Sequence, residues 1–353
     1  MQLLCIGDVA FGSHNPIMPV WDAPPGMTPG EEERILFNWE LPIGTVINPI
    51  PRSSGPRIIA HPDSPRIIRN WAPGFAALAT NHILDAGKEG LANTLHTLQQ
   101  EGFTTLGAGL SSQEIKRPLI WATAEGKLAV VNWVFPEAHP DWMSIPGPNC
   151  WPGIEEAKNV IRDLRTQADW VIVLAHWSDE LFPYPRPEDR EIAYELATAG
   201  ADMLIGHHPH VVRGMELIAA CPVFYSLGNF YFSNVADSTG AWIVKQAPRN
   251  REALAIWIRF TRGMPPEYQP RSFWQKKDCT VADPLHRAVR RMEYTSRPLQ
   301  HFKGKEYEEW YSAKRAQFDR IWGRWHFGVR RLGLFGLMQR FARGLGSGMF
   351  TSH

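Results

Sequence analysis

The sequence GADMLIGHHPH occupies residues 200–210 and joins an apolar run to a cluster of histidines. The run at 202–205 has the length and composition of a buried strand. Directly after it, His207, His208 and His210 lie within four residues, in a tight turn with glycine and proline. Three imidazoles in such a loop add little to packing, so the pattern favours a metal-binding or catalytic role. The sequence therefore predicts a buried strand whose carboxyl end carries a functional site.

Four other apolar runs also end in residues that bind metals or transfer protons. These residues are Asp8 after 2–7, Asn38 and Glu40 after 35–37, Asn81, His82 and Asp85 after 74–79, and His176 after 170–175. In an α/β sheet, the carboxyl ends of the strands are where ligands collect. Taken singly, Asp8 is typical of a turn or helix cap, and His176 of a satisfied core histidine. Five polar strand ends together favour a site.

The chemistry of these residues indicates a divalent cation. Carboxylate oxygens, imidazole nitrogens and an amide oxygen suit Mn²⁺, Fe²⁺, Zn²⁺ or Mg²⁺, and no thiolate stands among them. Two such ions close together can bind a phosphate ester and lower the pKa of a bridging water. We therefore expect one or two divalent ions and a phosphorylated substrate, either a small molecule or a polymer precursor.

The order of the elements predicts the fold class. Helical patterns lie at 88–100, 154–165 and 186–200, and they alternate with the apolar runs. Such alternation indicates an α/β sheet that is covered on both faces. We expect the segment 221–232 to form a further strand, and the segments 241–246 and 253–260 to form a closing hairpin.

Charge divides the chain at the point where this alternation stops. The whole chain has 37 Lys and Arg and 36 Asp and Glu, a net charge of +1. Residues 1–261 have 19 basic and 28 acidic residues, a net of −9, whereas residues 262–353 have 18 and 8, a net of +10. We therefore expect a main domain over 1–261 and a basic extension over 262–353, beginning with a loosely packed linker at 262–300.

The end of this extension has the pattern of an amphipathic helix. From Arg320 to His353, six arginines and no acidic residue are interleaved with aromatic and apolar residues spaced by three or four. This composition is typical of a helix at an anionic membrane surface. A membrane surface or a synthase subunit is the expected partner of residues 305–353, and packing on the acidic domain is the alternative. Nucleic acid is disfavoured, because the acidic domain would repel phosphates.

Several features of the sequence predict a cytoplasmic protein. Residues 2–7 run directly into Asp8 without a basic n-region or a cleavage site, and no apolar stretch reaches 18 residues. The four cysteines are far apart, which disfavours a zinc ribbon or a disulfide framework. The expected location is the cytoplasm, with peripheral attachment to the inner face of the membrane as the alternative.

Seven short motifs occur in the order found in a known family. They are Gly7-Asp8, Asn38-x-Glu40, Thr80-Asn81-His82-x-x-Asp85-x-Gly87, Ala175-His176-Trp177, Gly200-Ala201-Asp202, Gly206-His207-His208-Pro209-His210 and Tyr225-Ser226-Leu227-Gly228-Asn229-Phe230. Through them, residues 2–233 resemble the bacterial capsule-synthesis proteins of the CapA, or poly-γ-glutamate synthesis, type, which are similar to the calcineurin-like metallophosphoesterases. The resemblance implies a four-layer α/β sandwich of two mixed sheets flanked by helices, here with a basic, helical C-terminal extension.

The resemblance also implies roles for individual residues. The metal ligands would be Asp8, Glu40, Asn81, His176, His208 and His210. His82 would be the general acid or a donor to the transition state, oriented by Asp85. The residues that bind substrate or support the ligands would be His207, Asn38 and Asn229.

Two departures from the phosphoesterase pattern bear on activity. Ala10 stands where the phosphoesterases have a histidine, and Glu40 where they have the shorter Asp. A single ion, or a weakly bound second ion, is therefore an alternative to a pair. The resemblance implies a metal-dependent phosphoesterase of capsule or extracellular-polymer synthesis, in which metal-activated water attacks a phosphate ester. The alternative is a non-catalytic accessory or scaffold subunit of a membrane-associated synthesis complex, which Ala10 favours.

Overall fold

The structure is a computed structural model that describes residues 1–12, 18–44, 56–136, 138, 145–236, 242–244 and 246–321. The chain forms two compact units, Met1–His301 and Phe302–His353. In the second unit, residues 304–321 are helical, and the ring of Trp310 stacks on the rings of Phe302 and Tyr307. No helix among the described residues is long and apolar enough to cross a membrane.

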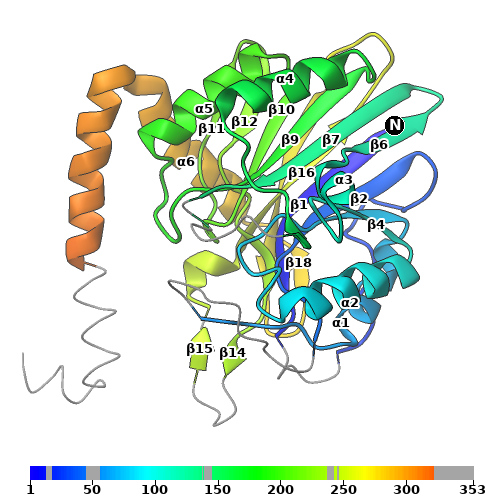
Figure 1. The fold of residues 1–353 in the computed structure, drawn as a ribbon. Helices are drawn as coiled ribbons and strands as arrows, with labels where there is room; N and C mark the ends of the chain where they lie inside the picture. Colours follow the sequence, from blue (N-terminus) through cyan, green and yellow to red (C-terminus); the bar gives the residue numbers. More distant parts are fainter. Residues whose placement is uncertain are drawn as a thin grey trace, which may run out of the picture. The chain divides into compact units, whose positions relative to one another are not determined.

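The first unit is built on two mixed sheets (Figure 1). The eight-stranded sheet has the order β18–β17–β16–β1–β2–β3–β4, with β13 also paired to β1. Its strands are β1 (Gln2–Ala10), β2 (Glu33–Trp39), β3 (Gly74–Ala77), β4 (Phe103–Leu106), β13 (Asn229–Phe232), β16 (Glu252–Arg259), β17 (Glu267–Gln275) and β18 (Thr280–Ala282). The six-stranded sheet has the order β11–β12–β10–β9–β7–β6. Its strands are β6 (Leu119–Thr123), β7 (Gly126–Val134), β9 (Trp170–His176), β10 (Met203–His207), β11 (Met215–Ile218) and β12 (Cys221–Phe224).

Alternating side chains on the strands create two separate hydrophobic cores. Leu3 of β1 shares one core with Ile172 of β9, and this core lies between the sheets. Leu4 points to the opposite face, where it shares the other core with Leu91 of α2 (Gly87–Gln100). The period of two thus buries both faces of the eight-stranded sheet at β1.

Helices cover the outer face of each sheet, and Figure 1 shows the resulting layers, with α2 on one side and α4 and α5 on the other. The helices α4 (Ile154–Arg165) and α5 (Pro187–Thr198) contact β9 and β10. The expected four-layer α/β sandwich is therefore confirmed, together with the three expected helices. Proline at the first turn of α5 and the Asp189 carboxylate, which accepts from the Arg186 N–H at 2.8 Å, explain where this helix begins.

Smaller elements complete the first unit. They are α1 (Ser64–Ile67), η1 (Arg69–Trp71), β5 (Ala108–Gly109), α3 (Ser112–Lys116), β8 (Gly147–Pro148), β14 (Val235–Ala236), β15 (Trp242–Val244), η2 (Pro248–Arg251) and α6 (Arg287–His301). The pairs β5–β8 and β14–β15 are two-stranded sheets.

Two of the strand predictions are wrong in detail. The segment 221–232 is not one strand: β12 belongs to the six-stranded sheet and β13 to the eight-stranded sheet, so the chain crosses between sheets at 225–228. The expected hairpin of 241–246 with 253–260 does not form, because β15 pairs with β14 while β16 lies between β1 and β17. The apolar residues of β16 are buried on both faces, which a terminal hairpin would not achieve.

The expected boundary after residue 261 lies inside the first unit. The segment 262–300 is not a loose linker: β17 pairs with β16 along Glu252–Arg259, and α6 buries Ala288 and Met292 in the core between the sheets. Its Pro- and Arg-rich composition misled the prediction, because β17 and α6 are half exposed and need few apolar residues. Most of the expected amphipathic helix, residues 322–353, lies outside the described residues.

Candidate metal centre

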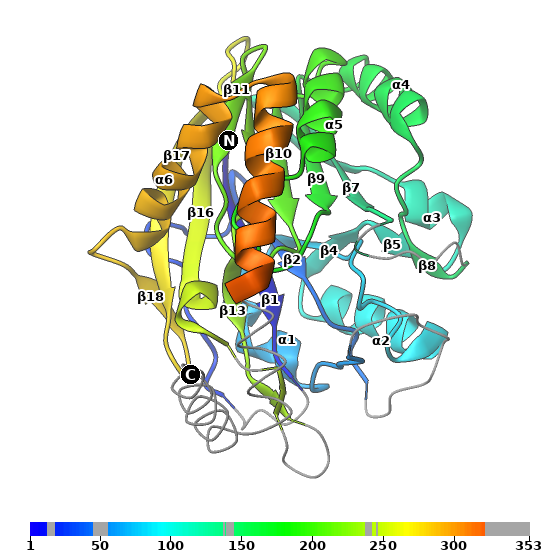
Figure 2. The ribbon, with the colours of Figure 1, turned by 90° about the vertical axis from the view of Figure 1, so that its left-hand side faces the viewer.

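The carboxyl ends of parallel strands bring the predicted site residues to one place. β1 pairs in parallel with both β2 and β13, which sets Asp8 beside Asn38 on one side and Asn229 on the other. In the second sheet, β9 and β10 are parallel, and His176 lies opposite His207. Figure 2 shows β9 and β10 ending in the middle of the unit, near β1 and β2.

The eight-stranded sheet forks at Gly7 and Asp8. Residues 2–6 of β1 pair with β16, whereas Asp8 and the residues after it pair with β13 on the same side. Any side chain on residue 7 would collide with the Gly228 carbonyl oxygen. The same oxygen accepts a hydrogen bond from the Asp8 N–H at 3.0 Å. Glycine at position 7 therefore permits the close crossing that positions the Asp8 carboxylate.

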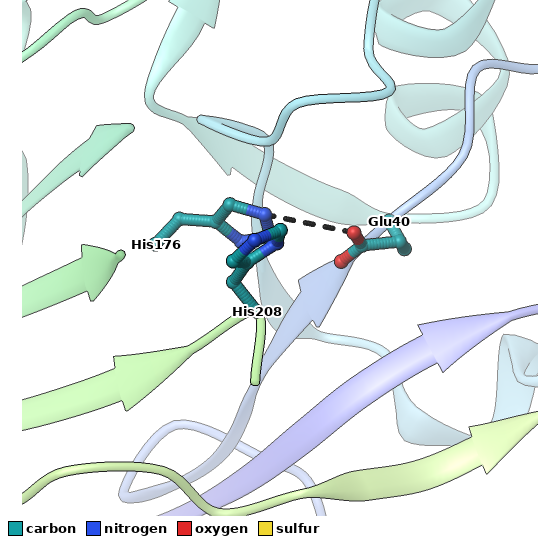
Figure 3. Close-up of side chains that lie close together, drawn as sticks. All are labelled: Glu40, His176 and His208. Atoms are coloured by element: carbon teal, nitrogen blue, oxygen red, sulfur yellow. Dashed lines mark ion pairs between the residues drawn. The ribbon is translucent and has the colours of Figure 1, made fainter. Parts of the chain in front are cut away.

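Ligand atoms from three loops converge on His176. Its Nε2 lies 3.0 Å from Asn81 Oδ1 and 3.6 Å from Glu40 Oε1. The ring of His208 is 4.8 Å from that of His176 between centroids. Potential ligand atoms of Glu40, His176 and His208 all lie within 4.8 Å of one another, and all three residues are buried. Figure 3 shows both imidazole rings next to the Glu40 carboxylate.

Asp8 lies between two further histidines. Its Oδ1 is 3.2 Å from His207 Nδ1, and its Oδ2 is 3.1 Å from His210 Nδ1. The same His210 nitrogen is 2.9 Å from Asn229 Oδ1, and Asn250 donates to the His210 carbonyl oxygen. His207 thus contacts Asp8, and Asn229 contacts His210; contacts of this kind can orient both side chains.

Asn38 joins the two buried carboxylates. Its Nδ2 donates to Asp8 Oδ1 at 3.0 Å and to Glu40 Oε2 at 2.6 Å. A shared donor reduces the repulsion between the two acidic groups and fixes their separation. Both donor hydrogen bonds of Asn38 go to carboxyl groups that are predicted ligands, and its role stays a prediction.

His82 and Asp85 form a buried pair beside this group. The His82 Nδ1 lies 2.6 Å from Asp85 Oδ2, which also accepts from the Ile58 N–H at 2.9 Å. The contact fixes the orientation of the ring, as predicted, and leaves Nε2 as the nitrogen that can face a substrate. His82 follows Asn81 directly, so the pair lies next to the ligand atoms around His176.

Electrostatic interactions distinguish the members of the group. Burial opposes a charge on Asp8, but His207 and His210 outweigh it and hold the Asp8 pKa well below its usual range. Burial, together with the charge of Asp8, raises the pKa of Glu40 to about 8. Burial also opposes a charge on His210, yet the contact with Asp8 raises its pKa to about 10. Without a cation, Glu40 is therefore protonated at neutral pH, and His210 is charged and paired with Asp8.

The remaining two imidazoles are held neutral. Burial, followed by the unfavourable interaction of two protonated rings with His208 nearby, lowers the pKa of His176 well below its usual range. Burial and the charge of His210 do the same for the pKa of His208. Neutral imidazoles are the form that ligates metals, so neither ring has to lose a proton first.

A family comparison identifies the relatives of the chain. Residues 23–234 match the family described as bacterial capsule synthesis protein PGA_cap. The chain belongs to this family. The matched range contains every predicted site residue except Asp8.

Several relatives of the chain have been described in other bacteria. The PGA biosynthesis protein CapA of Bacillus subtilis (strain 168) is 30% identical over 159 residues, which cover 44% of this chain and 41% of that protein. The capsule biosynthesis protein CapA of Bacillus anthracis is 29% identical over 170 residues, covering 45% and 40%. A Mycobacterium tuberculosis (strain H37Rv) protein described as a probable polyglutamine synthesis accessory protein is 29% identical over 182 residues, covering 48% of each chain. The match spans less than half the length of these relatives.

Three solved structures are similar to the chain at low sequence identity. A hypothetical protein from Thermus thermophilus has a TM-score of 0.47 at 15% identity, covering 78% of this chain and all of that chain. A putative 5'-nucleotidase from Staphylococcus aureus has a TM-score of 0.45 at 11% identity, covering 83% and 58%. The NAD nucleotidase of Haemophilus influenzae has a TM-score of 0.44 at 12% identity, covering 91% and 60%.

The residues of this PGA_cap chain fit a divalent cation. Among the described residues, the buried His208 Nδ1 has no hydrogen-bond partner. A buried polar atom in that state costs about 1–3 kcal/mol, which a bound cation offsets. The donor set of carboxylate, amide and imidazole groups is the one that Mn²⁺, Fe²⁺ and Zn²⁺ accept. Glu40, His176, His208 and Asn81 would hold one such ion.

The sequence analysis missed one member of the group. Potential ligand atoms of Glu180, His208 and His210 also lie within 4.8 Å of one another, and Glu180 is exposed. Glu180 lies in the loop after β9, four residues beyond His176, where no periodic pattern indicates which side chains turn inward. The only local signal was an acidic residue, Glu180, shortly after a predicted ligand, His176, at a strand end.

The histidine loop has an unusual backbone. His208 and His210 have φ angles of 91° and 57°, in the left-handed region that favours glycine. Such conformations cost about 1–3 kcal/mol each and persist where the surroundings enforce them. The surroundings of the loop thus hold His208 and His210 in a costly backbone conformation, and a functional role of this loop stays a prediction.

Proposed function

We propose that the chain is a metal-dependent phosphoesterase that acts in the synthesis of a bacterial capsule or a poly-γ-glutamate-type polymer. The observation that carries the proposal is the convergence of Glu40 Oε1 and Asn81 Oδ1 on His176 Nε2, with His208 alongside. These atoms are buried and come from both sheets, and this placement has little value for packing alone.

The residues of the centre would have different roles in such a reaction. A divalent cation bound there supplies a Lewis acid for the phosphoryl oxygens and lowers the pKa of water. Asn38 and His207 hold the carboxylate ligands in position. His82, oriented by Asp85, can donate a proton from Nε2 to the leaving oxygen.

The polymer assignment comes from the family and from the names of the relatives. The chain belongs to the PGA_cap family, and two relatives are described as CapA proteins of PGA or capsule biosynthesis. The substrate we propose is a phosphorylated small molecule or polymer precursor, because a buried cation centre with imidazole donors suits phosphate oxygens.

Hydrolysis of two generic esters tests the proposal. The purified chain should cleave p-nitrophenyl phosphate or bis(p-nitrophenyl) phosphate when Mn²⁺ is added, and His208→Ala and Asp8→Asn should abolish the cleavage. His96→Ala, an exposed histidine of α2, is the matched control and should retain wild-type activity. Absence of both hydrolysis and Mn²⁺ binding in the wild-type chain would overturn the proposal.

A non-catalytic accessory role is the second candidate. It is favoured by Ala10, which is buried where the phosphoesterase pattern has histidine, and the M. tuberculosis relative is described as an accessory protein. The two functions differ in one measurement. An accessory subunit should bind Mn²⁺ at the centre but hydrolyse neither ester, and His82→Ala should leave its metal binding and biological effect unchanged.

A further inference from the structure

The loop after β9 is fastened to the histidine loop after β10. The Trp177 N–H donates to the His207 carbonyl oxygen at 3.2 Å, and the Leu181 N–H donates to the Pro209 carbonyl oxygen at 2.8 Å. Glu180 lies between these two bonds, opposite the residues that carry the imidazoles. Its position relative to His208 and His210 is therefore set by the backbone.

A buried arginine, Arg213, donates hydrogen bonds to the same loop. Arg213 donates to Ser178 Oγ at 2.6 Å, to the Asp179 carbonyl oxygen at 2.7 Å and to the Phe182 carbonyl oxygen at 2.9 Å. Two loop residues, Ser178 and Leu181, adopt φ angles of 71° and 64°. A solvated turn that only carries an exposed glutamate requires neither these hydrogen bonds nor the positive φ angles. The loop conformation is therefore fixed by its surroundings.

The side of the centre near Asp8 lacks a ligand. Residue 10 is Ala, whose side chain has no atom that can bind a metal. Asp8 faces His210, and residue 10 of β1 adds no further ligand beside them. Glu180 approaches the same imidazole from the other sheet, with potential ligand atoms of Glu180, His208 and His210 within 4.8 Å of one another. Its charge is close enough to influence both Glu40 and His210.

We propose that Glu180 is a ligand of a second divalent cation, held with His210 and Asp8, and that it takes the place of the donor missing at Ala10. The proposal rests on the metal-dependent function proposed above, and it adds a second ligand in the region after β9, four residues beyond His176. His208 lies within reach of both ions, while Glu40, Asn81 and His176 belong to the first. The centre would then hold two ions with a carboxylate ligand from each sheet.

Metal counting on the full chain tests this assignment. The chelator-treated protein is dialysed against increasing Mn²⁺, the bound metal is counted, and the electron paramagnetic resonance spectrum is recorded for spin-coupled ion pairs. Glu180→Gln removes the proposed ligand at an exposed position, so the fold should persist. Asp179→Asn removes the same charge from the same loop, and Glu188→Gln removes it from the exposed first turn of α5.

The wild-type chain should bind two Mn²⁺ and give the spin-coupled signal. Glu180→Gln should weaken the second ion by about tenfold or more and lose that signal, while Glu188→Gln should match the wild type. The assignment is overturned if Glu180→Gln binds Mn²⁺ like Glu188→Gln, or if Asp179→Asn weakens binding to the same extent, since charge alone would then explain the loss. A wild-type chain that binds no Mn²⁺ overturns the proposed function as well, whereas unchanged binding in Glu180→Gln leaves that function intact.

Discussion

The Nε2 atom of His176 lies 3.0 Å from the Oδ1 atom of Asn81, although the two residues are 95 positions apart and follow strands of different sheets. At this distance, the amide oxygen and the imidazole nitrogen can both bind the same cation. Asn81→Ala should therefore weaken Mn²⁺ binding by about 10–100-fold, as measured by isothermal titration calorimetry. Asn93→Ala on the exposed side of α2 is the control, and equal affinities in the two variants would contradict a ligand role for Asn81.

Removal of the cation should destabilise the chain. Asn38 holds the buried carboxyl groups of Asp8 and Glu40 close together in the native chain, and a cation finds no such assembled site in the unfolded chain. Binding at a free concentration one hundred times the Kd stabilises the native state by about 2.7 kcal/mol. Adding a chelator should lower the Tm in differential scanning calorimetry, and renewed Mn²⁺ should restore it. A Tm that is independent of Mn²⁺ would count against the centre.

Metal affinity should rise with pH between 6 and 8. The pKa of Glu40 is raised to about 8, so below that pH the carboxyl group keeps a proton that a cation must displace. Affinity for an ion held by Glu40, His176, His208 and Asn81 should increase by as much as tenfold per pH unit until Glu40 ionises. An ion that binds His210, whose pKa is raised to about 10, has to displace a further proton. His176 and His208 are already neutral and contribute no proton. Calorimetry in two buffers of different ionisation enthalpy measures the protons released; a value of zero at pH 7 would refute the argument.

Arg213 should be essential for stability. Its guanidinium is buried and makes three hydrogen bonds to the loop after β9, and Asp189 lies 3.9 Å away. Arg213→Met removes these donors and leaves buried acceptors behind, which should lower the free energy of unfolding by about 3 kcal/mol. Urea denaturation checks the value. Arg162→Met, at an exposed position of α4, should change it by less than about 0.5 kcal/mol.

The basic C-terminal segment should direct the chain to anionic membranes. Residues 320–353 have six arginines and no acidic residue, and each basic residue near an anionic surface contributes about 1 kcal/mol. The full chain should sediment with vesicles that contain phosphatidylserine, and a chain ending at His301, the last residue of the first unit, should stay in the supernatant. Neutral vesicles are the control. Equal sedimentation of the two chains would leave domain packing as the explanation.

Local sequence patterns predicted the parts of this molecule that depend on neighbours in the chain. The helices at α2, α4 and α5 and the polar ends of β1, β9 and β10 follow from periodicity and from the residues next to each run. What could not be predicted depends on partners far away in sequence. The choice of β14 over β16 as the partner of β15, and the approach of Glu180 to His210, are decided by tertiary packing.

Composition was the least reliable guide. The Pro- and Arg-rich segment 262–300 suggested a linker, but a partly exposed strand and a half-exposed helix need only one apolar face. Met292 and Leu299 supply that face on α6, seven positions apart. The positive net charge of residues 262–353 therefore did not mark the end of the first unit, because β17 and α6 belong to that unit.

Because the sheet forks at Gly7 and Asp8, the backbone at Asp8 is fixed by more strand pairs than the backbone at Glu180. Moving Asp8 would require β2, β13 and β16 to change register together, because all three are hydrogen-bonded to the same strand. Glu180 lies outside the strands, on a loop held by Arg213 and by two backbone hydrogen bonds, so a change at this position alters no strand pair. Chains that share this framework can therefore be expected to diversify at the Glu180 end, while the acidic end keeps a fixed geometry.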